Sequence, residues 1–155
     1  MPAPTISHVI LTGALLILVF TVQVFYFYVV DNIWAEMVRR ELKEIADYVA
    51  DTIANLYFIV NATNTNPTSE KTLKLPLEIG GSGYSLQITF DQNNFAQTVK
   101  GELQGKSWFN VNSWLPPGLK VNTGKTETIE SSARTVVAAC QRVSSNIYVW
   151  IAYKG

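Results

Sequence analysis

Few residues in this sequence have the types and spacing that chemistry requires. The one cysteine, Cys140, lies in an apolar stretch with no histidine nearby in sequence, and the one histidine, His8, has no partner base or nucleophile near it. The glycine-rich segment 80–83 lacks a following Lys-Ser/Thr pair and leads into a strand pattern, so it predicts a turn rather than a phosphate loop. Asp91 and Asn93 lack the glycine and the final glutamate of a calcium loop. The sequence therefore predicts no catalytic residue, no cofactor and no metal site, and we expect a non-enzymatic protein.

Composition narrows the class of protein further. The 155 residues are enough for one domain, and 48% of them are hydrophobic, which excludes a disordered chain. Only 15% are charged, well below the roughly 25% of soluble domains. Twelve basic residues balance twelve acidic ones, so the basic excess of a nucleic-acid-binding protein is missing. A single cysteine excludes an internal disulfide.

The low charge has a local cause in residues 6–30, a run of 25 residues without a formal charge apart from any on His8. As a helix this run is roughly 37 Å long, against about 30 Å for the hydrocarbon core of a bilayer. Four aromatic residues, 25–28, stand at its end, as in an interfacial belt. A core helix would have a polar face, and a cleaved signal would have a basic lead and a small-residue cleavage site. We expect an uncleaved, single-pass membrane anchor, with lipid contacts from Ile6, Val9, Leu16, Phe20, Phe25 and Val30.

An amphipathic stalk is predicted to follow at residues 31–59, without Pro or Gly to end the helix. Apolar positions recur there with a period near 3.5. They are Val38, Leu42, Ile45, Val49, Thr52, Leu56 and Ile59, with Met37, Ala46 and Ile53 beside them. Two coverings for this stripe stay open: the chain's own C-terminal domain, or other subunits.

A polar linker is predicted at residues 61–70, which are rich in Asn and Thr. It contains the sequon Asn61-Ala62-Thr63, so Asn61 is a candidate for N-glycosylation. The predicted head, residues 71–155, changes to a period of two. We expect a first hairpin from 73–79 and 84–90, with Pro76 placing its first strand at a sheet edge.

A second hairpin is expected from 135–143 and 147–153, and shorter strands near 98–103, 108–112 and 125–130. Six to eight short strands favour a small antiparallel β-sandwich. The expected fold is therefore α+β: a long transmembrane and amphipathic helix followed by a β-sandwich, with the outline of a lollipop.

Two signals for membrane orientation disagree. Arg39, Arg40 and Lys43 follow the apolar run, and the positive-inside rule places them in the cytoplasm. That rule weakens for anchors that precede long translocated domains, and the Asn-, Thr-, Trp- and Tyr-rich head is typical of an extracytoplasmic module. We expect the head outside the cell membrane.

The lead Thr5-Ile6-Ser7-His8-Val9-Ile10, running directly into the helix, resembles archaeal type IV pilin-like proteins, and among them the F and G stator accessory proteins of the archaellum. The segment 75–86, LPLEIGGSGYSL, is similar to segments of other archaeal pilin-like membrane proteins. The resemblance implies an uncleaved anchor and a soluble domain that binds surface-layer protein and braces a rotating motor. The chain lacks the basic residue and glycine that precede a prepilin helix and the glutamate at its fifth mature position, which argues against a processed major pilin.

The function we expect is protein–protein contact by the head in an archaeal filament or stator assembly. The partners would be membrane lipid and envelope proteins, either surface-layer or filament and stator subunits, in a homo- or hetero-oligomer without nucleic acid. Trp108, Phe109 and Trp114 are candidate contact residues, although burial in the core is the more ordinary role for each. Two alternatives remain: an uncleaved pilin-like filament subunit, and a membrane-anchored sensor whose head has a ligand pocket.

Overall fold

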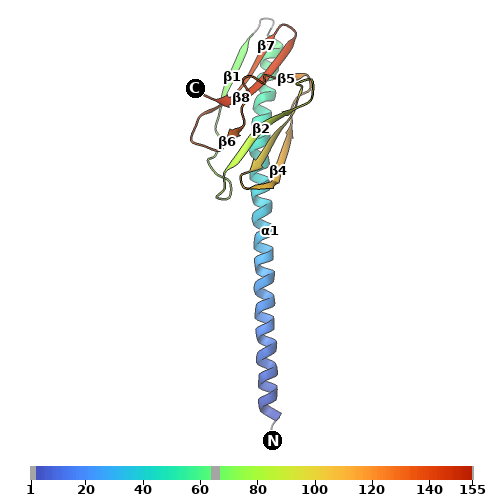
Figure 1. Ribbon diagram of the computed structural model, residues 1–155, viewed down its shortest axis with the longest axis vertical. Helices are drawn as coiled ribbons and strands as arrows, with labels where there is room; N and C mark the ends of the chain where they lie inside the picture. Colours follow the sequence, from blue (N-terminus) through green and yellow to red (C-terminus); the bar gives the residue numbers. More distant parts are fainter. Residues whose placement is uncertain (1–2, 64–66, 155) are drawn as a thin grey trace. The chain divides into compact units, whose positions relative to one another are not determined.

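The chain has an α+β fold in which one long helix precedes two small β-sheets (Figure 1). The computed structural model describes residues 3–63 and 67–154, with side chains from His8 onward. The helix α1 covers Ala3–Ala62. The strands are β1 (Thr68–Leu73), β2 (Tyr84–Phe90), β3 (Ala96–Leu103), β4 (Lys106–Trp114), β5 (Leu119–Val121), β6 (Ile129–Glu130), β7 (Val136–Val143) and β8 (Asn146–Tyr153).

The chain divides into two compact units. Among the described residues, the N-terminal unit, bounded by Met1–Met37, is the first part of α1. The C-terminal unit, Val38–Gly155, contains the rest of α1 and the strands β1 to β8. The predicted amphipathic stalk from Val38 onward thus belongs to the same folded unit as the sheets.

Each sheet has four strands, in the orders β1-β7-β8-β5 and β4-β3-β2-β6. All pairs are antiparallel except β5 with β8, which run parallel. Figure 1 shows strands of both sheets alongside the cyan and green part of α1. The predicted second hairpin is confirmed, because β7 and β8 pair from Val136↔Tyr153 to Val143↔Asn146.

The first predicted hairpin is wrong. Its first strand, 73–79, is replaced by β1 at Thr68–Leu73, which pairs with β7 rather than with β2. Pro76 has no N–H for a ladder, and its carbonyl instead accepts a 2.6 Å hydrogen bond from the Tyr84 hydroxyl. Gly80 and Gly81, with φ of 55° and 75°, then turn the chain into β2. The first strand is nonetheless at a sheet edge.

Other boundaries also differ from those expected. The predicted strand at 125–130 shortens to β6, and β5 was not predicted at all. In the predicted linker, α1 continues to Ala62 and β1 begins at Thr68. Residues 64–66 of that linker lie outside the described residues.

The core of the C-terminal unit forms where the helical stripe meets the inner faces of both sheets. Eight apolar side chains of α1 are at most 4% exposed: Val38, Leu42, Ala46, Val49, Ala50, Ile53, Leu56 and Val60. On β3, a Cβ added to Gly101 would lie only 3.2 Å from Leu42 Cδ1, so a glycine lets the helix approach the sheet closely. On β7 of the other sheet, the Cys140 thiol faces the Ile53 carbonyl, with 3.8 Å between sulfur and oxygen. Of the two coverings left open by the sequence, the chain's own sheets are the one observed.

The stripe turns relative to the predicted one. Ile59 and Met37 are 57% and 46% exposed, whereas Val60 is fully buried. A straight helix drifts about 20° for every seven residues of a 3.5-residue repeat. Over the three heptads from Val38 to Ile59 that drift carries Ile59 out of the core and brings Val60 into it.

Candidate interaction surfaces

Residues 9–30 of the N-terminal unit expose large apolar side chains along the helix. Within α1 a segment is long and apolar enough to cross a membrane, and none of its most apolar 18-residue window is buried. The predicted anchor residues Val9, Leu16, Phe20, Phe25 and Val30 are 42–71% exposed in the chain. The side chain of Ile6 lies outside the described residues. This helix is compatible with a single-pass anchor, and its aromatic end, residues 25–28, is 64–68% exposed.

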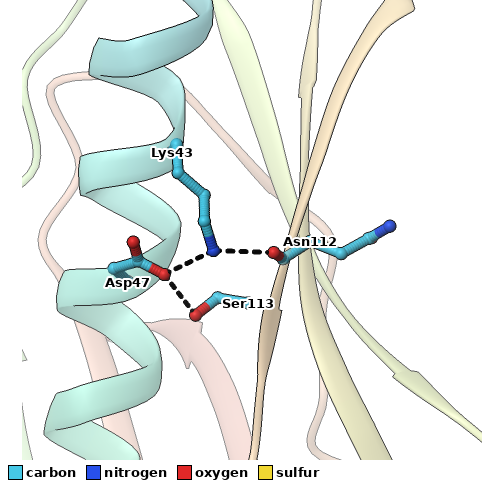
Figure 2. A network of polar contacts seen from close by, with 4 residues as sticks. All are labelled: Lys43, Asp47, Asn112 and Ser113. Carbon is cyan, nitrogen blue, oxygen red and sulfur yellow. Dashed lines mark hydrogen bonds and ion pairs between the residues drawn. The ribbon is translucent and has the colours of Figure 1, made fainter.

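A polar network fixes the second part of α1 to strand β4 (Figure 2). Lys43 Nζ donates to Asp47 Oδ1 at 2.7 Å and to the Asn112 carbonyl at 2.8 Å. The Ser113 hydroxyl donates to the same Asp47 oxygen at 2.6 Å. Partial burial alone would raise the pKa of Asp47, but these two hydrogen bonds and the Lys43 charge outweigh it, so the pKa lies below its ordinary value. The network sets the position of β4 along the helix. The sequence does not indicate the contacts between helix and strand, because their partners are 66 to 69 residues apart.

A second set of hydrogen bonds connects the end of α1 to a strand. Arg142, on β7, donates to the Thr63 carbonyl at 2.8 Å and to Asn61 Oδ1 at 2.9 Å. A guanidinium there satisfies a carbonyl that has no partner within the helix. The predicted glycosylation residue Asn61 is exposed, in the last turn of the helix.

Two titratable side chains, Cys140 and Tyr84, are buried in the core of the C-terminal unit. Cys140 is fully buried, and burial raises its pKa to about 12, so the thiol is not ionised near neutral pH. Burial likewise raises the pKa of Tyr84 to about 12, and its hydroxyl donates a hydrogen bond to the Pro76 carbonyl. Among the described residues, no three His, Cys, Asp or Glu side chains are grouped so that they could hold a metal ion.

A groove of about 350 Å³ lies beside α1 in the C-terminal unit. Its walls combine charged and apolar side chains: Glu41, Glu44, Ile45, Tyr48, Lys74, Leu75, Pro76, Glu78 and Ile79. It is open to solvent.

The three predicted contact residues separate into two groups. Phe109 is 9% exposed and belongs to the core, which is the more ordinary role expected from the sequence. For Trp108 and Trp114 the expectation of burial is wrong, because they are 68% and 80% exposed. The three residues lie on β4, whose side chains alternate between the two faces of the sheet. The even spacing of the tryptophans, with Phe109 out of phase, is the sequence signal that would have separated them.

The outer face of the sheet β4-β3-β2-β6 is otherwise polar. Asn110 and Asn112 lie between the two tryptophans on β4, and Figure 2 shows the Asn112 side chain pointing away from α1. Their partners on β3 are Glu102 and Lys100, which form an ion pair of 2.8 Å. The next row on β2 contains Ser85, Gln87 and Thr89. The C-terminal unit thus exposes a polar sheet face with a tryptophan at each end of its edge strand.

Comparison of the chain with protein-family models, with curated proteins and with solved structures found no match.

Proposed function

We propose that this chain is a non-enzymatic, membrane-anchored protein of the archaeal cell envelope. In this proposal the N-terminal unit crosses the cell membrane once, and the C-terminal unit lies outside and makes protein–protein contacts in a filament or stator assembly. The observation that carries it is an unburied apolar helix, long enough to span a bilayer, in the same chain as a folded β unit. The reason for proposing a filament or stator assembly is the resemblance of residues 5–10 and 75–86 to archaeal pilin-like and archaellum stator proteins.

The anchor is supported by energetics as well as by length. The exposed apolar side chains of residues 9–30 would be costly in water, at about 25 cal/mol for each Å² of apolar surface. A bilayer removes that cost, and a helix satisfies its own backbone hydrogen bonds there.

Membrane orientation is tested first, by thiol labelling of intact archaeal cells. The native thiol is replaced with Cys140→Ala, and a reporter is added with Ser145→Cys in the exposed β7–β8 turn. A matched reporter, Thr5→Cys, lies on the other side of the apolar run. A membrane-impermeant maleimide should label residue 145 in intact cells and residue 5 only after lysis. The reverse pattern would place the β unit in the cytoplasm and refute the proposed function.

The filament subunit is the second candidate, favoured by the continuous apolar surface of residues 9–30, which also suits helix–helix packing between copies. Shearing of cells separates surface filaments from membranes. A stator or envelope component should stay in the membrane fraction, whereas a filament subunit should appear in the sheared, high-molecular-weight fraction.

A further inference from the structure

The outer face of β4 combines two exposed tryptophans with a row of amides, and the proposed function does not use this combination. Trp108 and Trp114 are both exposed and out of phase with the buried Phe109, so both belong to the outer side of the strand. The register with β3 shifts between Lys106 and Asn110, so Trp108 lies in an irregular stretch, whereas residues 110–114 pair regularly with β3 over about 13 Å. Neither ring is needed for the core, since they are 68% and 80% exposed. Large, rigid aromatic rings in such positions are suited to contacts with a partner.

The groups between the two rings favour a polar and uncharged partner. Asn110 and Asn112 are exposed, and the Asn110 amide donates to the Ser107 carbonyl at 3.1 Å, which orients its oxygen. Lys100 and Glu102 neutralise one another at 2.8 Å. The face therefore has no basic excess for nucleic acid or for anionic lipid.

Further from the edge strand, hydroxyl and amide groups continue the same face. Thr98, opposite Trp114, is itself buried, and its hydroxyl is paired at 2.7 Å with that of the half-buried Thr89 of β2. Gln87 is exposed in the row that faces Lys100. Protein interfaces have an apolar, desolvated centre with their energetically important residues clustered in it. Here the arrangement is the opposite, with polar groups in the centre and the aromatic rings at the two ends.

We propose that this face, named here the Trp108–Trp114 platform, binds a neutral glycan chain. The C–H faces of pyranose rings are apolar and stack on indole rings, while their hydroxyls pair with amide, hydroxyl and carboxylate groups such as those between the tryptophans. The regular stretch between the two rings, residues 110–114, is about 13 Å long, which exceeds one sugar ring, so a partner that contacts both tryptophans is an oligosaccharide rather than a monosaccharide. The platform lies wholly within the C-terminal unit, and it does not depend on the filament or stator assignment.

The position of the platform is held from behind. The Asn112 carbonyl accepts from Lys43 and the adjacent Ser113 hydroxyl donates to Asp47, so the middle of the edge strand is fixed to α1 (Figure 2). This attachment restrains the stretch that precedes Trp114, which lowers the ordering cost of binding there.

The test uses the full chain in lipid nanodiscs on an array of immobilised neutral oligosaccharides built from hexoses and N-acetylhexosamines. We expect binding to at least one extended glycan. Trp108→Ala and Trp114→Ala should each raise the Kd about tenfold, the loss typical of one stacking ring. Trp114→Phe should restore much of the affinity because it keeps an aromatic face. Phe58→Ala, which removes a 63% exposed aromatic ring elsewhere in the same unit, is the matched control and should leave the Kd unchanged.

Each contrary result overturns the proposal. Absence of binding to every glycan on the array would do so, as would equal binding by the double tryptophan variant. Loss of self-association in that variant, measured by sedimentation in the same nanodiscs and without any glycan effect, would identify the face as a protein interface instead. Because both rings are exposed, the variants should keep the far-ultraviolet circular dichroism and the denaturant midpoint of the natural chain, which confirms an intact fold. Thiol labelling at residue 145 is independent of all these outcomes, so failure of the platform and failure of the proposed function are distinguishable.

Discussion

Truncation of Leu42 tests whether the amphipathic part of α1 is an integral element of the β unit. Leu42 is fully buried, and its side chain fills the space in front of Gly101 on β3. A Cβ added at Gly101 would lie 3.1 Å from Val111 Cγ2 and 3.2 Å from Leu42 Cδ1. The site is therefore closely packed by two sheet residues, and Leu42→Ala would leave a cavity between helix and sheet.

The size of the effect follows from that packing. Leu→Ala substitutions in closed cores cost about 2.7–5.0 kcal/mol, and the cost is greatest where the surroundings cannot collapse. Here two paired strands, β3 and β4, form the opposite wall, and their backbone hydrogen bonds resist movement. We expect Leu42→Ala to lower the free energy of unfolding of the C-terminal unit by about 3–4 kcal/mol.

The assay is guanidinium unfolding of the full chain in detergent micelles, followed by tryptophan fluorescence. Leu77→Ala is the matched control: the same atoms are removed from a leucine that is 57% exposed, so a loss below about 0.5 kcal/mol is expected. Equal losses in the two variants would refute the reasoning. So would an unfolding midpoint that rises with protein concentration, since other subunits would then be covering the stripe.

Three further predictions concern titratable groups. Asp47 has a lowered pKa, so its ionised form contributes stability above the unfolded-state pKa of about 3.9, and that contribution is lost as pH falls through the folded-state value. Asp47→Asn should therefore be less stable than the natural chain at pH 7, and the difference in unfolding free energy should shrink as the pH is lowered. A difference that stays constant with pH would contradict the network. Cys140, with its pKa raised to about 12, should react with maleimide at pH 8 only in denaturant, and rapid labelling of the folded chain would show that the strand is open. The pKa of Tyr84 is also raised, from about 10 to about 12, so the folded state loses up to about 1.4 kcal/mol of stability per pH unit between those values. Tyr84→Phe should be less stable at pH 7, because it loses the hydrogen bond to Pro76. It should not show this alkaline loss when unfolding is measured from pH 9 to 12.

Local sequence signals predicted the parts of the fold that local physics determines. The β7–β8 hairpin was found because two apolar, β-branched stretches flank the turn at residues 144–146, and such a pair needs only short-range contacts. The prediction of a strand at 73–79 is wrong, although apolar and polar residues alternate there, because Pro76 has no N–H to donate to a ladder. Leu77 is consequently exposed, whereas Leu73 and Ile79 are buried.

Interaction surfaces were harder to predict than strands. The type of residue at positions 108, 109 and 114 gave no distinction between core and surface, because aromatic side chains serve both. Only the phase of the strand separates Phe109 from the two tryptophans. The hydrogen-bond network between α1 and β4 could not be predicted from the sequence, because Lys43 and Asp47 have the spacing of an ordinary solvated i,i+4 ion pair.

No single environment stabilises all sixty residues of α1. From Val38 to Val60 one stripe is buried against the chain's own sheets, and that burial makes the helix stable in water. From Val9 to Val30 the large apolar side chains are exposed on all sides, and an isolated helix of that kind has neither tertiary packing nor a polar face to keep it soluble. The first part of the helix therefore requires an apolar surrounding that the chain does not supply. Lipid and the helices of neighbouring copies both provide it, so the apolar surrounding is needed as far as Val30, before the charged residues Asp31 and Glu36 and the start of the C-terminal unit at Val38.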